Sequence, residues 1–559
     1  MGIRDTIGSH TDASEYLPKS VREKTDLNAD TKLLMGTRGV ITDQTRYMYD
    51  KTDGVYYSIS KFQYFTSKQD LTLKHLQDQG HNPKDVILYF ENNKYHYILL
   101  NDCERMPLTS KEVLDTMSNK ELILEMLYED SRRDDSHLNI DKTLRKVQNT
   151  TENIIKGLET PEEKISAIYD YVLKNSRYID PIPKNDNRIY SGLEMFARGT
   201  GVCEGYTKLF VYMLSAAGIT DVEYKSGHIL EMTKGDDPTI GHAWVAIGDK
   251  YYDPTWDDPT FSGKKTQKDR EFSDYEYFGL PRDIMYANRI DRSKENDAKA
   301  IKFKKTTSKQ KQKDLIKARL YDLVGKYPKG KYKLLEEAEF RREHGIDATS
   351  PFTVKNLKKI FPLKTSNDFI SQGNYYTIDS KGLNFNILQQ AKQEKRVLFL
   401  DKKSRKYRLT QKVLPLISPE YLQKQGMKLY TSQDFMALGE YWTLSGNEKN
   451  IRYFSSEKGK KKIEENNYVL FYDAKSGEYM ITEKIMPLLQ EKDIINAFGT
   501  VYSSYDYGYK NGYTFTNNQK VINYINRKGL HFLKREGYIL FLDEDTKEYA
   551  IVKKENLIQ

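Results

Sequence analysis

Three residues that could together carry out nucleophilic catalysis occur in order within one short part of the chain. Cys203 stands in Gly-Val-Cys-Glu-Gly-Tyr, His242 in Gly-His-Ala-Trp and Asp253 in Tyr-Tyr-Asp-Pro-Thr-Trp. A thiol with an ordinary pKa of about 8.5 is mostly protonated at neutral pH, so a cysteine nucleophile needs a neighbouring base and a group that orients this base. Cysteine, histidine and aspartate supply these three roles once each.

The residues after Cys203 predict a helix that begins at the proposed nucleophile and stops at Gly218. Apolar residues recur there at spacings of three and four, namely Leu209, Tyr212, Met213 and Ala217. At a helix N-terminus, unpaired backbone N–H groups and the positive end of the helix dipole favour a thiolate and a developing oxyanion. Gly201 and Gly205 remove side-chain bulk on both sides of Cys203, and we expect this space to serve a substrate.

The dipeptide Gly248-Asp249 is a turn signal between two short apolar and aromatic runs, and this pattern predicts a β-hairpin. If the two residues form the turn, Asp253 lies opposite Trp244 and diagonal to His242. All three side chains then share one face of the hairpin, so the imidazole and the carboxylate can meet.

Together these motifs resemble the transglutaminase-like superfamily, in the form common among bacterial proteins. The resemblance spans about residues 135–281, and upstream Thr160-Pro-Glu-Glu163 fits as the start of a helix. It implies an α+β fold with a papain-like core, in which the nucleophile helix packs against an antiparallel sheet. It also implies that Cys203 is the nucleophile, His242 the general base and acid, and Asp253 the orienting acid.

The resemblance implies chemistry through a thioester, which either water or an amine resolves. Pocket shape and water exclusion decide between hydrolysis and transamidation, and no motif records them. The animal cross-linking enzymes of this superfamily carry calcium sites, but no aspartate-rich loop with calcium-ligand spacing stands out in this sequence. We therefore expect an enzyme without metal or cofactor, acting on a protein or peptide substrate as a protease or amidase, with transamidation as the variant.

Other readings of the same residues stay open. A lone cysteine is more often a small buried hydrophobe than a nucleophile, and Asp253 before a proline is a common turn-starter. His228, in Gly-His-Ile, is a rival base without the Ala-Trp context of His242. Substrate-lining residues or the oxyanion partner are expected among aromatic residues near the motifs, namely Tyr178, Tyr190, Tyr206, Trp244 and Trp256.

A hydrophobic run that precedes a tyrosine recurs four times and predicts small β-rich repeat modules, each ending in a hairpin. The runs are Ile87–Glu91, Val397–Asp401, Val469–Asp473 and Ile539–Asp543, followed by Tyr97, Tyr407, Tyr479 and Tyr549. The predicted organisation is an N-terminal segment (1–50), a first module (51–134), the catalytic domain (135–290), a basic and largely helical linker (291–350), and three further modules (351–430, 431–495 and 496–559). We expect such modules either to bind a cell-wall or surface polymer or to serve as spacers.

Composition excludes several classes of protein. The chain has 559 residues, a net charge of +9 and 43 tyrosines, and its mean hydropathy is −0.75. No apolar run is long enough for a transmembrane segment, and no phosphate-binding glycine loop or zinc-type cysteine pairing occurs. The lysine-rich stretch from Lys302 to Lys333 is interpreted as a solvated linker and helix face, which leaves attraction to anionic polymers open, and we expect no nucleic-acid partner. The two cysteines, Cys103 and Cys203, are expected to stay free. No targeting signal stands out, and the compartment is left open: cell surface if a signal peptide was removed, otherwise cytoplasmic.

Two functions remain open on the sequence alone. In the first, the chain is a cysteine acyl-transfer enzyme whose flanking modules hold it near its substrate. In the second, it is a non-catalytic scaffolding protein that uses the transglutaminase-like domain and the repeats for binding. The intact set of Cys203, His242 and Asp253 favours the enzyme.

Overall fold

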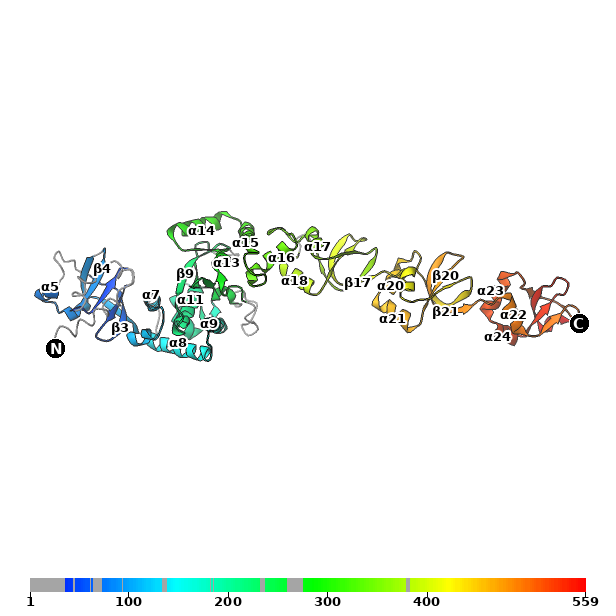
Figure 1. Ribbon diagram of the computed structural model, residues 1–559, viewed down its shortest axis with the longest axis horizontal. Coiled ribbons are helices and arrows are strands. Elements are labelled where there is room, and N and C mark those ends of the chain that lie inside the picture. The colour runs from blue at the N-terminus through cyan, green and yellow to red at the C-terminus, as the bar shows by residue number, and fades with distance from the viewer. Residues whose placement is uncertain are drawn as a thin grey trace. The chain divides into compact units, whose positions relative to one another are not determined.

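The computed structural model describes residues 36–559, apart from residues 44–45, 61, 64–72, 93, 133–137, 181, 184, 232–236, 259–274 and 379–382. Residues 1–35 of the predicted N-terminal segment therefore lie outside the described residues. The chain divides into two compact units, Met1–Ser350 and Pro351–Gln559 (Figure 1). Among the described residues, no helix is both long enough and apolar enough to cross a membrane.

Two small sheets form the first part of the Met1–Ser350 unit. One has the strand order β1-β4-β5, with β1 parallel to β4, and the other is the antiparallel sheet β2-β3-β6. Buried apolar side chains from both sheets make one core, including Ile41, Met48, Ile59 and Ile87. The elements are β1 (Gly39–Thr42), β2 (Tyr47–Asp50), β3 (Val55–Ser60), α5 (Leu73–Asp78), β4 (Val86–Glu91), β5 (Lys94–Leu99) and β6 (Glu104–Ser110).

Helices then build one side of the region around α11, which is buried along most of its length. The α9 helix begins with the predicted capping box, in which the Thr160 hydroxyl accepts from the Glu163 N–H and the Glu163 carboxylate accepts from the Thr160 N–H. The helices are α6 (Lys111–Asp115), α7 (Lys120–Ser131), α8 (Ile140–Ile155), α9 (Pro161–Asn175), α10 (Gly192–Arg198) and α11 (Cys203–Ala216). Gly218 follows α11 with φ +75°, as expected of a C-terminal stop.

An antiparallel five-stranded sheet of order β12-β11-β10-β9-β13 packs against α11. Residues alternate between its two faces: Val245 and Tyr252 share a core with α11, whereas Trp244 and Tyr251 pack on the opposite face against α13. The elements are β9 (Val222–Ile229), β10 (His242–Ile247), β11 (Lys250–Tyr252), β12 (Leu280–Pro281), α13 (Arg282–Met285) and β13 (Arg289–Asp291). The predicted α+β arrangement of a helix against an antiparallel sheet is therefore present.

The segment after β13 is helical and packs against the rest of this unit. Its helices are α14 (Lys294–Thr306), α15 (Lys309–Leu323) and α16 (Glu336–Glu343). The α14 helix contacts β9 and β13, and Arg319 of α15 donates to the carbonyl of Ala287 at 3.0 Å. This segment thus belongs to the same compact unit as the sheet.

The Pro351–Gln559 unit contains three four-stranded sheets of equivalent strand order, β14-β16-β17-β15, β18-β20-β21-β19 and β22-β25-β26-β24. Counted along the chain, the first strand of each sheet pairs in parallel with the third. A hairpin then joins the third strand to the fourth. The strands are β14 (Leu363–Thr365), β15 (Phe369–Thr377), β16 (Val397–Asp401), β17 (Lys406–Pro415), β18 (Leu429–Thr431), β19 (Phe435–Thr443), β20 (Val469–Asp473), β21 (Glu478–Pro487), β22 (Val501–Ser503), β24 (Gly512–Thr514), β25 (Tyr538–Leu542) and β26 (Tyr549–Lys553).

Helices lie between the second and third strands of each of these sheets: α18 (Phe385–Gln393) in the first, α20 (Glu448–Ser455) and α21 (Glu457–Glu465) in the second, α23 (Gln519–Lys528) and α24 (Leu530–Arg535) in the third. The remaining elements are α17 (Val354–Ile360), α19 (Pro419–Lys424), α22 (Glu491–Phe498), β23 (Gly508–Tyr509) and β27 (Leu557–Ile558). The runs noticed in the sequence are β4, β16 and β20 and most of β25, and each begins a hairpin. That the sheets are copies of one module, with the boundaries predicted above, stays a prediction.

Gly227 allows β9 and β13 to approach each other closely. A Cβ atom at this position would lie 2.0 Å from the carbonyl oxygen of Ile290. We expect Gly227→Ala to push β13 away and to lower the free energy of unfolding by about 1–3 kcal/mol, the usual range for overpacking. Thermal unfolding of the full chain checks this, with Ser226→Ala as the neighbouring control. Equal stability of the two variants would contradict the assignment.

Candidate active site

Cys203 is the first residue of α11 and is half-buried with a free thiol. Val202 precedes it in an extended conformation, and no side chain caps the helix. The backbone N–H groups of the first turn are therefore left for another acceptor, as an oxyanion site requires. The sequence placed Cys203 correctly at the start of the helix.

Gly201 and Gly205 have a different role from the one expected. A Cβ atom on either residue would lie 2.8 Å from the carbonyl oxygen of Ile189, and one on Gly201 would also lie 2.6 Å from Sδ of Met195. The two glycines therefore allow the nucleophile segment to pack against neighbouring backbone. The expectation that they leave room for a substrate is wrong, because the Ile189 carbonyl and the Met195 side chain already occupy that space.

The hairpin brings His242 and Asp253 together. In the observed register Val245 pairs with Tyr252, so Asp253 follows at the level of Trp244. The Nε2 atom of His242 lies 2.7 Å from Oδ2 of Asp253. The other ring nitrogen, Nδ1, is then left to face Cys203, whose side chain also hydrogen-bonds to His242. The predicted hairpin and its turn are confirmed by this register, whereas the catalytic roles stay predictions.

The charges around His242 favour its protonated form. Burial by itself would lower the pKa of His242, but the Asp253 carboxylate, with a smaller contribution from Cys203, raises it to about 9. His242 is therefore an imidazolium at neutral pH. An imidazolium beside a sulfur atom favours the ionised, nucleophilic form of that sulfur.

Asp253 is fully buried and has four hydrogen-bond donors. Its Oδ1 accepts from the N–H groups of Thr255 and Trp256, both at 3.2 Å, so it also caps α12 (Pro254–Asp257). Its Oδ2 accepts from His242 and from Nη1 of Arg289, the latter at 2.7 Å. Burial by itself would raise the pKa of Asp253, but the charges of His242 and Arg289 hold it below its usual range.

Arg289 is a residue that the sequence did not reveal. Both Arg289 and Asp253 have fully buried side chains. Three aromatic rings surround the guanidinium, with centroids 5.0 Å away for Tyr277, 5.2 Å for Trp244 and 5.7 Å for Trp256. Arg289 lies 36 positions after Asp253 in a three-residue strand, and no local pattern marks a single arginine there.

The aromatic candidates divide into buried and accessible ones. Trp244 and Tyr206 are fully buried, and the Tyr206 hydroxyl donates to Asp258, so these two rings are packing residues rather than substrate contacts. Trp256 is half-buried and stands edge-on to the His242 ring, with centroids 6.2 Å apart. Accessible aromatic surface next to the proposed base keeps Trp256 as a substrate-lining candidate.

Tyr178 and Tyr190 lie beside the backbone that leads into Cys203, and both are half-buried. Tyr178 ends β7 (Arg177–Tyr178), which pairs in parallel with β8 (Thr200–Gly201). Tyr190 ends a short 3-10 helix (Asn187–Tyr190), directly after Ile189, whose carbonyl accepts from the Val202 N–H. Both tyrosines remain candidates for the oxyanion partner.

The rival base, His228, lies on the other face of the sheet from His242. Gly227 pairs with His242 across the sheet, so the next residue, His228, points to the opposite face. There its Nε2 lies 3.2 Å from Oδ1 of Asp297 on α14, and burial lowers its pKa. His228 thus belongs to the contact between the sheet and α14.

Two buried charged residues, Asp257 and Lys208, connect the elements of the site to neighbouring helices. Neither was predicted from the sequence. Asp257 accepts from the Tyr169 hydroxyl at 2.6 Å and from the Glu276 N–H at 2.7 Å, and burial raises its pKa to about 7. Lys208, one turn after Glu204 on α11, is fully buried and pairs with Glu204 at 2.8 Å and with Asp130 of α7 at 2.5 Å. These contacts tie α12 and α11 to neighbouring helices.

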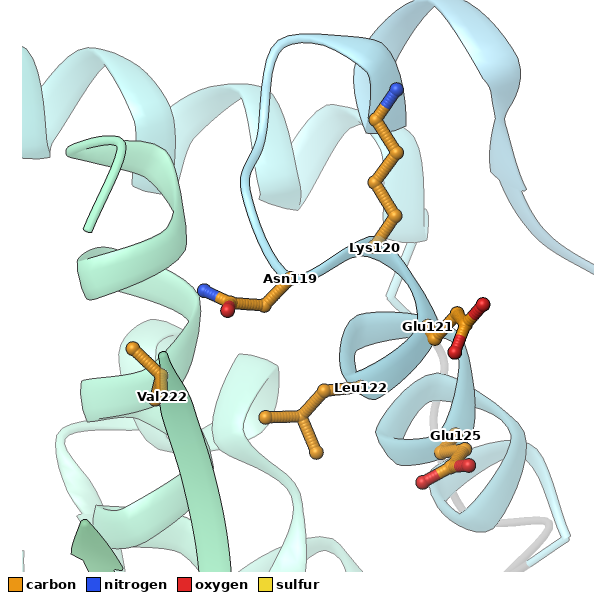
Figure 2. Close-up of a pocket in the computed structure, with 6 residues that line it drawn as sticks. All are labelled: Asn119, Lys120, Glu121, Leu122, Glu125 and Val222. Carbon is orange, nitrogen blue, oxygen red and sulfur yellow. The ribbon is translucent and has the colours of Figure 1, made fainter. Parts of the chain in front are cut away.

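A cavity of about 510 Å³ lies elsewhere, between the start of α7 and the start of β9 (Figure 2). Figure 2 shows the side chains of Asn119 and Leu122 directed toward Val222. None of Cys203, His242 and Asp253 lines this cavity. The cavity is therefore separate from these three residues.

The pKa of His242 predicts a loss of stability at alkaline pH. Because its folded-state pKa of about 9 exceeds the ordinary value of 6.5, this group's contribution is complete below pH 6.5 and is lost as the pH rises through 9. A shift of this size corresponds to at most about 3 kcal/mol. We expect the Tm of the full chain to fall between pH 7.5 and 9.5, and to fall less in His242→Gln. The same fall in both proteins would contradict the assignment.

Comparisons with known proteins identify the region around this site. Residues 148–256 match the family model of the Transglutaminase-like superfamily. Among solved structures, the chain is similar to a putative cysteine protease from Cytophaga hutchinsonii, with 22% identity and a TM-score of 0.17, over 20% of this chain and 37% of that chain. It is also similar to a TGase, with 13% identity and a TM-score of 0.17, over 36% of this chain and 50% of that one.

The chain thus spans half or less of the length of these two solved structures, and a likeness at this TM-score carries no argument about its function. None of the curated proteins matches the chain. The family match rests on the segment that contains Cys203, His242 and Asp253. Residues 148–256 therefore form a domain of the transglutaminase-like superfamily.

Proposed function

We propose that the chain is a cysteine-dependent acyl-transfer enzyme that cleaves protein or peptide amides through a thioester. The observation that carries the proposal is the 2.7 Å hydrogen bond between His242 and the buried Asp253, with Cys203 on the other side of the imidazole. A thiol, a base and an orienting acid in this order match the requirements of covalent catalysis by cysteine.

In the first half of the reaction the Cys203 sulfur attacks the amide carbonyl carbon. The N–H groups at the start of α11, together with a side chain such as Tyr178, stabilise the oxyanion. The His242 imidazolium donates its proton to the amide nitrogen as the C–N bond breaks. The amine leaves, and the acyl group remains on Cys203 as a thioester.

In the second half, neutral His242 accepts a proton from the incoming nucleophile as this attacks the thioester. The C–S bond breaks, and Cys203 leaves as a thiolate. Water as the nucleophile gives hydrolysis, and a primary amine gives transamidation. We favour hydrolysis, as in a protease or amidase, with transamidation as the variant that uses the same residues.

Thiol alkylation by iodoacetamide as a function of pH tests the first half without a substrate. We expect Cys203 to react with a midpoint well below that of a free thiol, and His242→Ala to remove this shift. Cys103 is an internal control, because burial raises the pKa of its thiol and it should react slowly at neutral pH. An ordinary midpoint for Cys203, unchanged in His242→Ala, would overturn the proposal.

We further propose that the Pro351–Gln559 unit holds the enzyme on an anionic polysaccharide. This unit has 34 lysines and arginines against 23 aspartates and glutamates, a net charge of +11, while residues 1–350 carry −2. Such a division of charge favours attraction of this unit to an acidic polymer.

Two exposed tyrosines suit contacts with sugar rings. Tyr375 is 53% exposed and Tyr441 is 61% exposed. They hold the same place in two sheets, each directly after a bulge that contains a glycine with positive φ. Arg408 lies 4.9 Å from the Tyr375 ring centroid, so an aromatic surface and a cation occur side by side.

Retention of the full chain on immobilised polygalacturonate tests this targeting. We expect the double variant Tyr375→Ala/Tyr441→Ala to bind several-fold more weakly, and both proteins to bind neutral dextran poorly. Tyr505→Ala, which removes a tyrosine that is 78% exposed outside these strands, is the matched control. Equal retention of the double variant and the control would contradict the proposed surface.

A further inference from the structure

Arg289 and the proposed catalytic base, His242, contact the same carboxylate oxygen of Asp253. Its Nη1 and the Nε2 of His242 both lie 2.7 Å from Oδ2 of Asp253. The side chains of Arg289 and Asp253 have no exposed surface, and that of His242 is 9% exposed. Asp253 is therefore an anion held between two cations and out of contact with water.

A buried carboxylate needs compensation throughout the reaction, not only at its start. While His242 is an imidazolium, it compensates Asp253. Once His242 has given its proton to the leaving amine, that compensation is gone, and an isolated buried carboxylate would draw a proton back. An arginine remains charged at any pH in this range, so it compensates Asp253 in both states.

The surroundings of Arg289 keep its charge directed at Asp253. Its Nε donates to the Asn288 side chain at 3.1 Å, and the rings of Trp244, Trp256 and Tyr277 surround the guanidinium. Aromatic faces attract a cation without competing for its hydrogen bonds. No carboxylate other than Asp253 is recorded within ion-pair distance of Arg289 among the described residues.

We propose that Arg289 is a positioning residue for acyl transfer: its permanent charge keeps Asp253 ionised and in place when His242 is neutral, so that His242 can accept a proton in the second half of the reaction. This inference rests on the proposed function. It adds a fourth residue, one that does not touch the reacting atoms, and it assigns that residue to the step that resolves the thioester.

Removal of the Arg289 charge is expected to shift the protonation of the His242–Asp253 pair in one direction. Without Arg289, the His242–Asp253 pair loses a nearby positive charge and should hold its proton to higher pH. His242 would then be less available as a base at neutral pH, while the protonated pair needed for attack by Cys203 is retained. Release of the acyl group should slow more than its formation.

The test compares Arg289→Gln, which keeps an N–H donor without the charge, with Arg289→Lys, which keeps the charge. In the full chain labelled with ¹⁵N-histidine, the His242 signal is identified by its loss in His242→Gln and titrated by NMR. We expect its titration to move alkaline by at least one pH unit in Arg289→Gln and to stay close to the wild type in Arg289→Lys. An unchanged titration in Arg289→Gln would overturn the inference.

Iodoacetamide labelling of the same proteins separates this inference from the proposed function. A wild-type Cys203 with an ordinary midpoint overturns the function. An activated wild-type Cys203 with an unchanged His242 titration in Arg289→Gln overturns only the role of Arg289.

If Arg289→Gln folds but is too unstable for the NMR titration, a double-mutant cycle with Asp253→Asn replaces the titration. Thermal unfolding should then show that Arg289→Gln is much better tolerated when Asp253 is neutral, because the two charges compensate each other. Equal destabilisation with Asp253 and with Asn at that position would mean that Arg289 serves only to fill the aromatic enclosure, which overturns the inference.

Discussion

The buried carboxylate of Asp253 is the constraint on which the site depends. A charged group without exposed surface is stable only when its oxygens are satisfied and its charge is compensated. The chain meets this demand with the two N–H groups that begin α12, the imidazole at the start of β10 and the arginine of β13. One side chain thereby fixes the positions of three elements, and the position of the base follows from them.

A second constraint is the close approach of backbone around the nucleophile. The carbonyl of Ile189 accepts from Val202 and lies where a Cβ on Gly201 or Gly205 would be. The backbone immediately before and after Cys203 therefore packs closely against the Ile189 carbonyl, which limits how far Cys203 can shift. The buried pairs of Lys208 extend this support from α11 to α7. Preorganisation of this kind is what an oxyanion site at a helix N-terminus requires.

Local signals in the sequence were sufficient for the parts of the site that short-range geometry determines. The turn at Gly248-Asp249 fixed the hairpin register, and the apolar spacing after Cys203 fixed the helix, because each depends on residues a few positions apart. The roles of the glycines and of Arg289 depend instead on tertiary contacts, with the Ile189 carbonyl and with Asp253, that no local pattern encodes. Glycines beside Cys203 suggest open space when only the sequence is known, because the position of the Ile189 carbonyl is not. An arginine in a short strand such as β13 is ordinarily expected to be exposed. Tyr206 and Trp244 were candidates for substrate contact, but both are fully buried and pack in the core. Their residue types suit a surface and a core equally well, so the sequence could not decide between these roles.

In the proposed reaction His242 must satisfy two opposite requirements, and its surroundings contain a group for each. Attack by Cys203 needs an imidazolium, which the Asp253 carboxylate favours by raising the pKa of His242 to about 9. Resolution of the thioester needs a neutral imidazole, which a carboxylate alone would oppose. A general base works best when its pKa is near the working pH, so a carboxylate that attracts the proton too strongly would slow the second step. In our proposal, the Arg289 guanidinium on the same Asp253 oxygen moderates that attraction without removing the hydrogen bond that orients the imidazole ring. One buried anion that contacts both a titratable and a permanent cation is thus the arrangement that the proposed roles of His242, first as acid and then as base, require.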